Sequence, residues 1–239
     1  MFYQQLMERF QQIVKNSDLE EEEVLITGRT LSAEEAIGNP MRRDFPIIKG
    51  KEKLMEAVFK GAKGQAFTDM PGDFRGQLQE VLAIKPENNF QRAVLISTMN
   101  AVLRYLGLID RTVHCRNEDP ELCSLELIQY IKQRFGHPRV ALVGYQPAML
   151  EKLQKHFEIR VLDLDTENIN QIKYGVLVEG PEKMHEVLEW CEIILATGST
   201  VVNATITDYC DLKPALFYGT TGAAAAKLMG LERWCHLGG

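Results

Sequence analysis

The chain has 239 residues, of which 45% are hydrophobic and 25% charged, and its formal net charge is −6 at pH 7 with a pI near 5.5. This composition is typical of a soluble globular protein of one large or two ordinary domains. The acidic balance excludes nucleic acid as the main partner, because no basic stripe is available to displace counterions, and no window approaches the ~18 apolar residues of a membrane helix.

The first part of the chain predicts a helix, a strand and then two longer helices. MFYQQLMERFQQIVKN places apolar residues along one face, which predicts an amphipathic helix; it lacks the charged and continuous apolar regions of a signal peptide. VLIT (24–27) predicts a strand, and a turn-rich stretch separates it from a long helix over 90–106. A further helix is expected from Asp119, as N-cap, with Pro120 at its first position.

The pattern changes near residue 137 to a regular alternation of short apolar runs and helices. Strands are expected over 139–144, 159–165, 192–198 and 213–219, with helices over 147–157, 181–191 and 220–230. Such strands, buried on both faces, indicate a parallel sheet covered by helices. We therefore predict an α/β fold: a smaller α+β domain over residues 1–136, followed by a Rossmann-like, doubly wound domain over 137–239.

Two of these strands end in similar polar loops. Each apolar run is followed by glycine and by hydroxyl side chains, and ligands of open parallel sheets bind beyond such strand ends. Backbone N–H groups and short hydroxyls suit a carboxylate, a phosphate or a polar cofactor edge, although they can also simply cap the next helix. The candidate ligand-binding residues are Thr197, Gly198, Ser199, Thr200, Asn203 and Thr205 in the first loop and Gly219, Thr220 and Thr221 in the second.

The first strand of the alternation ends in Gly144-Tyr-Gln-Pro, which is not the GxGxxG pattern of dinucleotide-binding folds. Asp163 stands where such folds place the acid that binds a ribose. This arrangement keeps a nucleotide-like ligand such as S-adenosylmethionine open, beside the alternative that Asp163 only caps a turn. Gly144 and Asp163 are therefore further ligand-binding candidates.

Soft metal ligands are present without the paired spacing of a zinc site. His114-Cys115, Cys123, Cys210 and Cys235-His236 could serve a transition metal, and Cys235 and His236 are the metal candidates. Five cysteines without a CxxC argue against a disulfide scaffold, and a reducing cytoplasm is the expected compartment. Asn100, an amide in an apolar helix face, is expected either to tie down neighbouring backbone or to face a cleft.

Several segments together resemble the putative heavy-metal chelation family, a microbial family of unknown function. They are STMNAVLRYLG, RVALVGYQPAMLEKL, IRVLDLD, ILATGSTVVNATITD and FYGTTGAAAAKLMGLERWCHLGG. The resemblance implies an enolase-N-terminal-like domain before the Rossmann-like one, with the site between them. Positions of the family motifs match Asn100, Gly144 and the 197–205 loop in this chain. His236, in contrast, stands where the carboxyl-terminal segment of the family usually has proline.

Three classes of function remain in view. The first is a small-molecule, metal or metal-chelate binding protein with its site in the interdomain cleft and a role in heavy-metal handling. The second is an enzyme, a transferase or lyase, that uses a nucleotide-like cofactor such as S-adenosylmethionine on a carboxylated substrate; no Ser-His-Asp order, P-loop or paired-carboxylate motif supports it. The third is a purely structural interaction protein. Binding is favoured, with a small-molecule or metal partner and with homo-oligomerisation left open.

Overall fold

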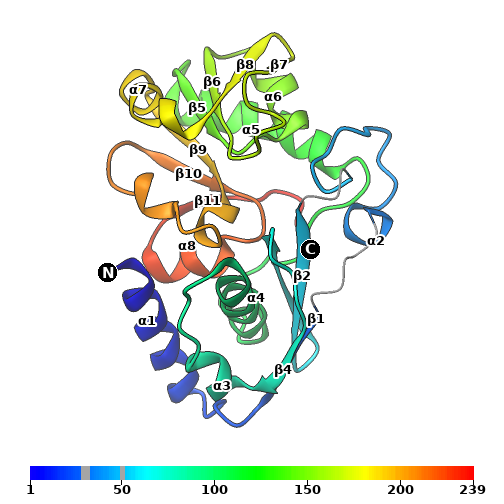
Figure 1. The fold of residues 1–239 in the computed structure, drawn as a ribbon, viewed down its shortest axis with the longest axis vertical. Coiled ribbons are helices and arrows are strands. Elements are labelled where there is room, and N and C mark those ends of the chain that lie inside the picture. Colours follow the sequence, from blue (N-terminus) through cyan, green and yellow to red (C-terminus); the bar gives the residue numbers. More distant parts are fainter. Residues whose placement is uncertain (28–32, 49–51) are drawn as a thin grey trace.

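The computed structural model describes residues 1–27, 33–48 and 52–239 and contains two sheets (Figure 1). The first sheet has four antiparallel strands in the order β3-β2-β1-β4. Their bounds are β1 Glu23–Thr27, β2 Lys53–Phe59, β3 Ala62–Thr68 and β4 Phe74–Gln77. The strand predicted over 24–27 is confirmed, while the hairpin of β2 and β3 was not predicted.

The second sheet has seven strands in the order β11-β10-β9-β5-β6-β8-β7. All neighbouring strands pair in parallel except β7 and β8, which form an antiparallel hairpin. The bounds are β5 Val140–Val143, β6 Ile159–Leu162, β7 Ile172–Lys173, β8 Val176–Glu179, β9 Ile193–Thr197, β10 Ala215–Tyr218 and β11 Glu232–Trp234. Read from β8 to β11, this is the 3-2-1-4-5-6 order of the Rossmann fold, with its switch point between β5 and β9.

The helices complete both parts. They are α1 Phe2–Asn16, α2 Ala33–Ile37, α3 Leu78–Leu82, α4 Asn89–Tyr105, α5 Asp119–Phe135, α6 Pro147–Leu153, α7 Met184–Trp190 and α8 Ala223–Met229, with the 3₁₀ turns Pro181–Lys183, Gly198–Val201 (η2) and Ile206–Asp208 (η3). Among the described residues, no helix is both long and apolar enough to span a membrane.

Alternate side chains of the parallel strands enter different cores, which is the signature of a doubly wound sheet. Ala141 and Val143 of β5 belong to one cluster, together with α7 and α8 side chains. Val140 and Leu142 of the same strand belong to another, together with side chains of α5 and α6. Because both faces of β5 are covered, this strand is buried and apolar throughout, and the predicted α/β fold class is confirmed.

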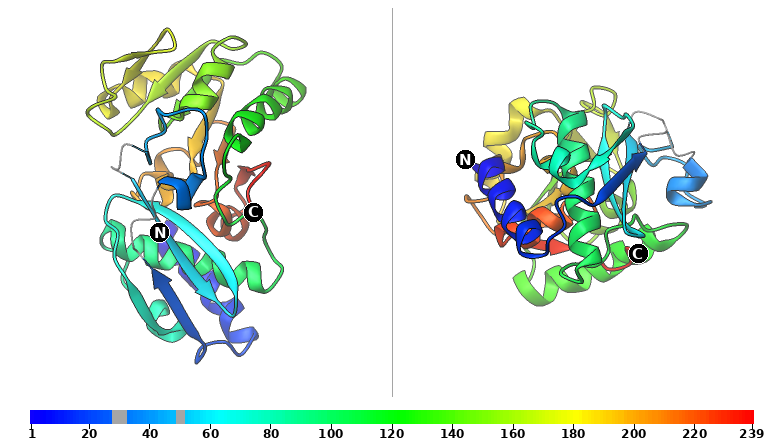
Figure 2. Two further views of the ribbon diagram at one scale, coloured as in Figure 1. Left: turned by 90° about the vertical axis from the view of Figure 1, so that its right-hand side faces the viewer. Right: turned by 90° about the horizontal axis from the view of Figure 1, so that it is seen from below.

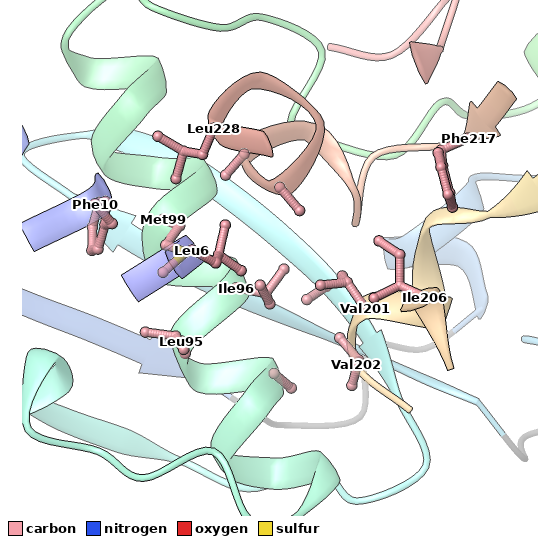
Figure 3. Close-up of a cluster of buried hydrophobic side chains, with 14 of the residues drawn as sticks. Leu6, Phe10, Leu95, Ile96, Met99, Val201, Val202, Ile206, Phe217 and Leu228 are labelled. Atoms are coloured by element: carbon pink, nitrogen blue, oxygen red, sulfur yellow. The ribbon is translucent and has the colours of Figure 1, made fainter. Parts of the chain in front are cut away.

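Helix α4 joins the two sheets into one body. It begins with a capping box at Asn88, whose side chain accepts from the Gln91 backbone N–H, and it is buried along residues 93–103. Figure 3 shows Ile96 and Met99 of α4 between α1 side chains and Val201 of η2. One core cluster therefore contains side chains from both sheets and fixes one sheet against the other.

Candidate functional site

A pocket of about 390 Å³ lies between the two sheets, in the size range of small-molecule sites. One wall comes from the part of the chain before residue 124, for example Phe45 and Phe67. The other wall comes from the segments that follow the carboxyl ends of β5, β6, β9 and β10, where open parallel sheets bind ligands. Figure 2 shows the two parts stacked along the long axis of the molecule.

The two hydroxyl loops meet at the floor of this pocket. A Cβ atom on Gly198 would lie 2.5 Å from the Gly222 backbone nitrogen, so the loops approach as closely as glycine allows. Gly144 has φ +87°, and a Cβ there would meet the Thr197 methyl at 2.7 Å. Tyr218 lies beneath and donates from its hydroxyl to the Gly144 carbonyl at 2.8 Å. Small residues thus bring three strand ends together.

The loop residues divide into those that line the pocket and those that hold the loop. Thr200 is buried and its hydroxyl donates to the Thr197 carbonyl at 2.8 Å, while the Thr205 hydroxyl donates to Asn203 Oδ1 at 2.7 Å. Neither residue reaches the pocket, and neither does Gly198. The lining residues from the predicted set are Gly144, Asp163, Thr197, Ser199, Asn203, Gly219, Thr220, Thr221 and Cys235.

Asn100 does not line the pocket; it positions the wall. Its amide nitrogen donates to the carbonyls of Gln65 on β3 (3.0 Å), Thr221 (3.1 Å) and Thr220 (3.3 Å). Its oxygen accepts from the Ala224 N–H at 2.8 Å. Of the two roles expected for this amide, the structure shows the tying of backbone, and the tie joins the first sheet to the Thr220–Thr221 turn.

Carboxylates from both parts of the chain converge on one side of the pocket. Glu52 precedes β2, Asp69 follows β3, and Asp163 and Asp165 follow β6. Asp163 accepts from the backbone N–H groups of Tyr145 and Asp165, each at 2.6 Å, yet burial raises its pKa. Burial, and then the charges of Asp163, Asp165 and Asp69, raise the pKa of Glu52 to about 7, even though solvent reaches this side chain through the pocket.

Thiols and aromatic rings line another side. Cys115, Cys123 and Cys235 all line the pocket, and all five cysteines of the chain are free. Burial raises the pKa of Cys115, and the nearby Cys235 and Cys123 raise it further. Burial likewise raises the pKa of Cys235, so both groups are neutral thiols near pH 7.

Trp234 anchors the end of β11 beside these thiols. Its ring centroid lies 4.7 Å from that of Tyr130 on α5 and 5.7 Å from that of His236, which stacks on it. His236 stacks on the indole and does not line the pocket, whereas Cys235 does. The two adjacent metal candidates therefore face different surroundings, as neighbours in an extended segment do.

The donor chemistry for a metal is present, but it is dispersed. Carboxylates, thiols and the imidazole of His114 all line the pocket, and burial lowers the pKa of His114, which keeps it neutral. Among the residues that the structure describes, however, no group of three or more His, Cys, Asp or Glu side chains is placed to hold one metal ion. The pocket as it stands does not fit a bare ion that requires several protein ligands.

Glu52 and Asp69 were not predicted from the sequence. Asp69 lies in a turn, TDMPGD, and Glu52 stands in a charged stretch, KGKEK, which reads as solvated surface. Only the packing of the first sheet against the strand ends of the second brings them to the pocket. Tyr145, which lines the pocket beside Gly144, was also missed, although its position after the first strand was a usable signal.

These features define a class: a two-sheet α/β protein with a Rossmann-ordered parallel sheet and a pocket between its sheets. Residues 127–224 match the model of the family described as putative heavy-metal chelation, which confirms the resemblance stated from the sequence motifs. No curated protein matches the chain.

Two solved structures that resemble this one come from the family whose model matches residues 127–224. A protein of unknown function from Pyrococcus horikoshii is 17% identical, with a TM-score of 0.56, over 91% of this chain and 80% of that one. A second, from Desulfitobacterium hafniense, is 12% identical, with a TM-score of 0.49, over 74% of this chain and 72% of that one. The likeness to the Pyrococcus protein, at this identity, concerns the fold.

Proposed function

We propose that this protein binds a small molecule, or a metal in the form of a chelate, in the pocket between its two sheets. The observation that carries the proposal is the pocket of about 390 Å³ at the ends of β5, β6, β9 and β10, the position at which Rossmann-ordered sheets bind ligands. The family description supports a role in heavy-metal handling. A cytoplasmic protein with reduced cysteines fits this role.

The lining chemistry supports a chelate over a bare ion. A volume of about 390 Å³ is far larger than an ion requires, and among the described residues no three His, Cys, Asp or Glu side chains are placed to hold one ion. An organic ligand that already encloses a metal needs only a few protein contacts, and the side chains on each wall can supply them. The three thiols are then available as additional soft ligands.

A second candidate is an enzyme that uses a nucleotide-like cofactor. It is favoured by the 3-2-1-4-5-6 strand order and by Asp163, which follows the second strand of that order, β6. In this function Asp163 would accept from ribose hydroxyls, and the substrate would lie toward the first sheet. Tyr145, Gln146 and Pro147 stand in place of a glycine-rich turn, which disfavours a pyrophosphate-bearing cofactor.

A pocket-filling variant tests the proposed function. Ser199→Trp places an indole at the pocket wall, and Ser17→Trp, at the end of α1 and away from the pocket, is the matched control. Thermal shifts would be recorded with nickel, zinc and cadmium, each free and as citrate or histidine chelates, and with S-adenosylmethionine. We expect at least one chelate to raise the Tm of the wild type and of S17W, and S199W to lose that rise.

The unliganded Tm of each variant shows whether it has folded. A ligand that stabilises S199W as much as the wild type binds outside the pocket and contradicts the proposal. Stabilisation of the wild type by S-adenosylmethionine alone would favour the second candidate. Absence of any shift across the whole series would contradict both.

A further inference from the structure

Among the described residues, the charged side chains that line the pocket are all acidic. Glu52, Asp69, Asp163 and Asp165 line it, whereas no lysine or arginine occurs among its described lining residues. Burial lowers the pKa of His114 and raises the pKa of Cys115, Cys235 and Tyr218, so these four lining side chains are neutral near pH 7. The charged side chains among these lining residues would therefore repel an anionic ligand.

The acidic residues reach the pocket from both sheets, so they are not a local surface patch. The carboxyl groups interact: Asp163, Asp165 and Asp69 each raise the pKa of Glu52. Like charges gathered in a partly enclosed space raise the free energy of the empty state, and a bound positive charge relieves that repulsion. A cation bound beside Glu52, Asp69 and Asp163 would therefore be favoured.

A second observation points to a ligand independently of charge. Thr220 lines the pocket and is 2% exposed, and its hydroxyl oxygen has no hydrogen-bond partner among the described residues. Buried hydroxyls are normally paired, and an unpaired one requires an explanation. A ligand atom that donates to or accepts from Thr220 would satisfy it.

The volume of the pocket and its apolar lining residues indicate what the uncharged part of the ligand is like. Phe67 and Met149 line the pocket together with Trp234. Such walls contact a body of organic size, as in most small-molecule pockets.

The inference rests on the carboxylates of the pocket, the unpaired Thr220 hydroxyl and the apolar lining residues. We infer that the ligand is a positively charged small molecule without phosphate, and that its charged group lies beside these carboxylates. This inference rests on the proposed function. An organic cation and a cationic metal chelate share the required chemistry, and the experiment separates the two sources.

Equilibrium dialysis against a defined mixture is the test. The protein would be dialysed against equimolar spermidine, arginine, S-adenosylmethionine and nickel–histidine chelate as cationic or chelate probes. Adenosine and S-adenosylhomocysteine serve as probes without a net positive charge, and AMP and citrate as anions. Bound compounds would be measured by mass spectrometry, and nickel by elemental analysis, with free nickel in a separate dialysis. We expect enrichment of a cationic or chelate probe and none of the anions.

The variant pair Glu52→Gln and Asp69→Asn, combined in one protein, removes two acidic groups without touching Asp163, which holds backbone N–H groups. We expect the affinity for the enriched probe to fall at least tenfold, which is about 1.4 kcal/mol. The control Glu126→Gln and Glu189→Gln removes two exposed charges outside the pocket and should leave the affinity unchanged.

Affinity in the wild type should also rise as pH increases from 6 to 8, because Glu52, whose pKa is about 7, becomes ionised over this interval beside Asp69, Asp163 and Asp165. This pH dependence should flatten in E52Q/D69N.

Each outcome is decisive. Enrichment of AMP or citrate, or an unchanged affinity in a folded E52Q/D69N protein, overturns the cation inference while the proposed function stands. Binding of free nickel alone, with no organic probe, overturns the inference and leaves only a bare-metal role. Binding of nothing in the mixture overturns both.

Discussion

Single residues in this protein do more to shape the pocket than their positions in the sequence suggest. Asn100 is the clearest case. The sequence indicates that an amide in an apolar helix face needs hydrogen-bond partners, but it does not indicate which groups those partners are. Its partners lie 35 and 121 residues away, on β3 and in the Thr220–Thr221 turn. Contacts of that separation depend on tertiary packing, and local pattern carries no information about them.

Asn100→Ala leaves three backbone carbonyls and the Ala224 N–H without this side chain. We expect the free energy of unfolding to fall by about 2–4 kcal/mol, because a buried network loses its centre. Urea denaturation would measure the change, with Asn16→Ala, at the exposed end of α1, as a control within about 0.5 kcal/mol of the wild type. A loss below 1 kcal/mol would show that water or local movement replaces the amide.

At the scale of elements, the buried apolar strands and the well-capped helices were predictable, and the strands toward the two ends of the second sheet were not. β5, β9 and β10 follow runs of buried apolar residues, whereas β7, β8 and β11 have two to four residues each. Such strands exist only because a neighbour supplies hydrogen bonds. β11 brings Trp234 and Cys235 to the pocket; Cys235 was a candidate from the sequence, but the strand that positions it was not predicted.

The segment after β11 is fastened to residues 104–113. Val113 and Gly239 exchange two backbone hydrogen bonds, at 3.0 and 2.9 Å, and Arg104 donates to the Gly239 carbonyl at 2.7 Å. Removing residues 236–239 should therefore cost about 3 kcal/mol, at roughly 1 kcal/mol for each lost hydrogen bond. Chemical denaturation of the shortened protein measures this cost, and a stability equal to that of the full chain would mean that the segment is not held as described.

At the scale of the whole molecule, the fold class could be anticipated from the sequence, but the enclosure of the pocket could not. The parallel sheet placed Gly144, Asp163 and the hydroxyl loops at one edge from pattern alone. The opposing wall, with Glu52 and Asp69, depends on how α4 packs the first sheet against the second. The division of the chain at residues 136 and 137 stays a prediction, because one core cluster includes residues from both sides of it.

The central claim is that a positively charged ligand lies between the two sheets and touches both. A crystal structure of the protein saturated with the probe enriched in dialysis tests it most directly. The account predicts ligand density in the pocket, with its positive group near Glu52 and Asp163 and a polar atom near the Thr220 hydroxyl. Density at another surface, with this pocket filled by water alone, would contradict it.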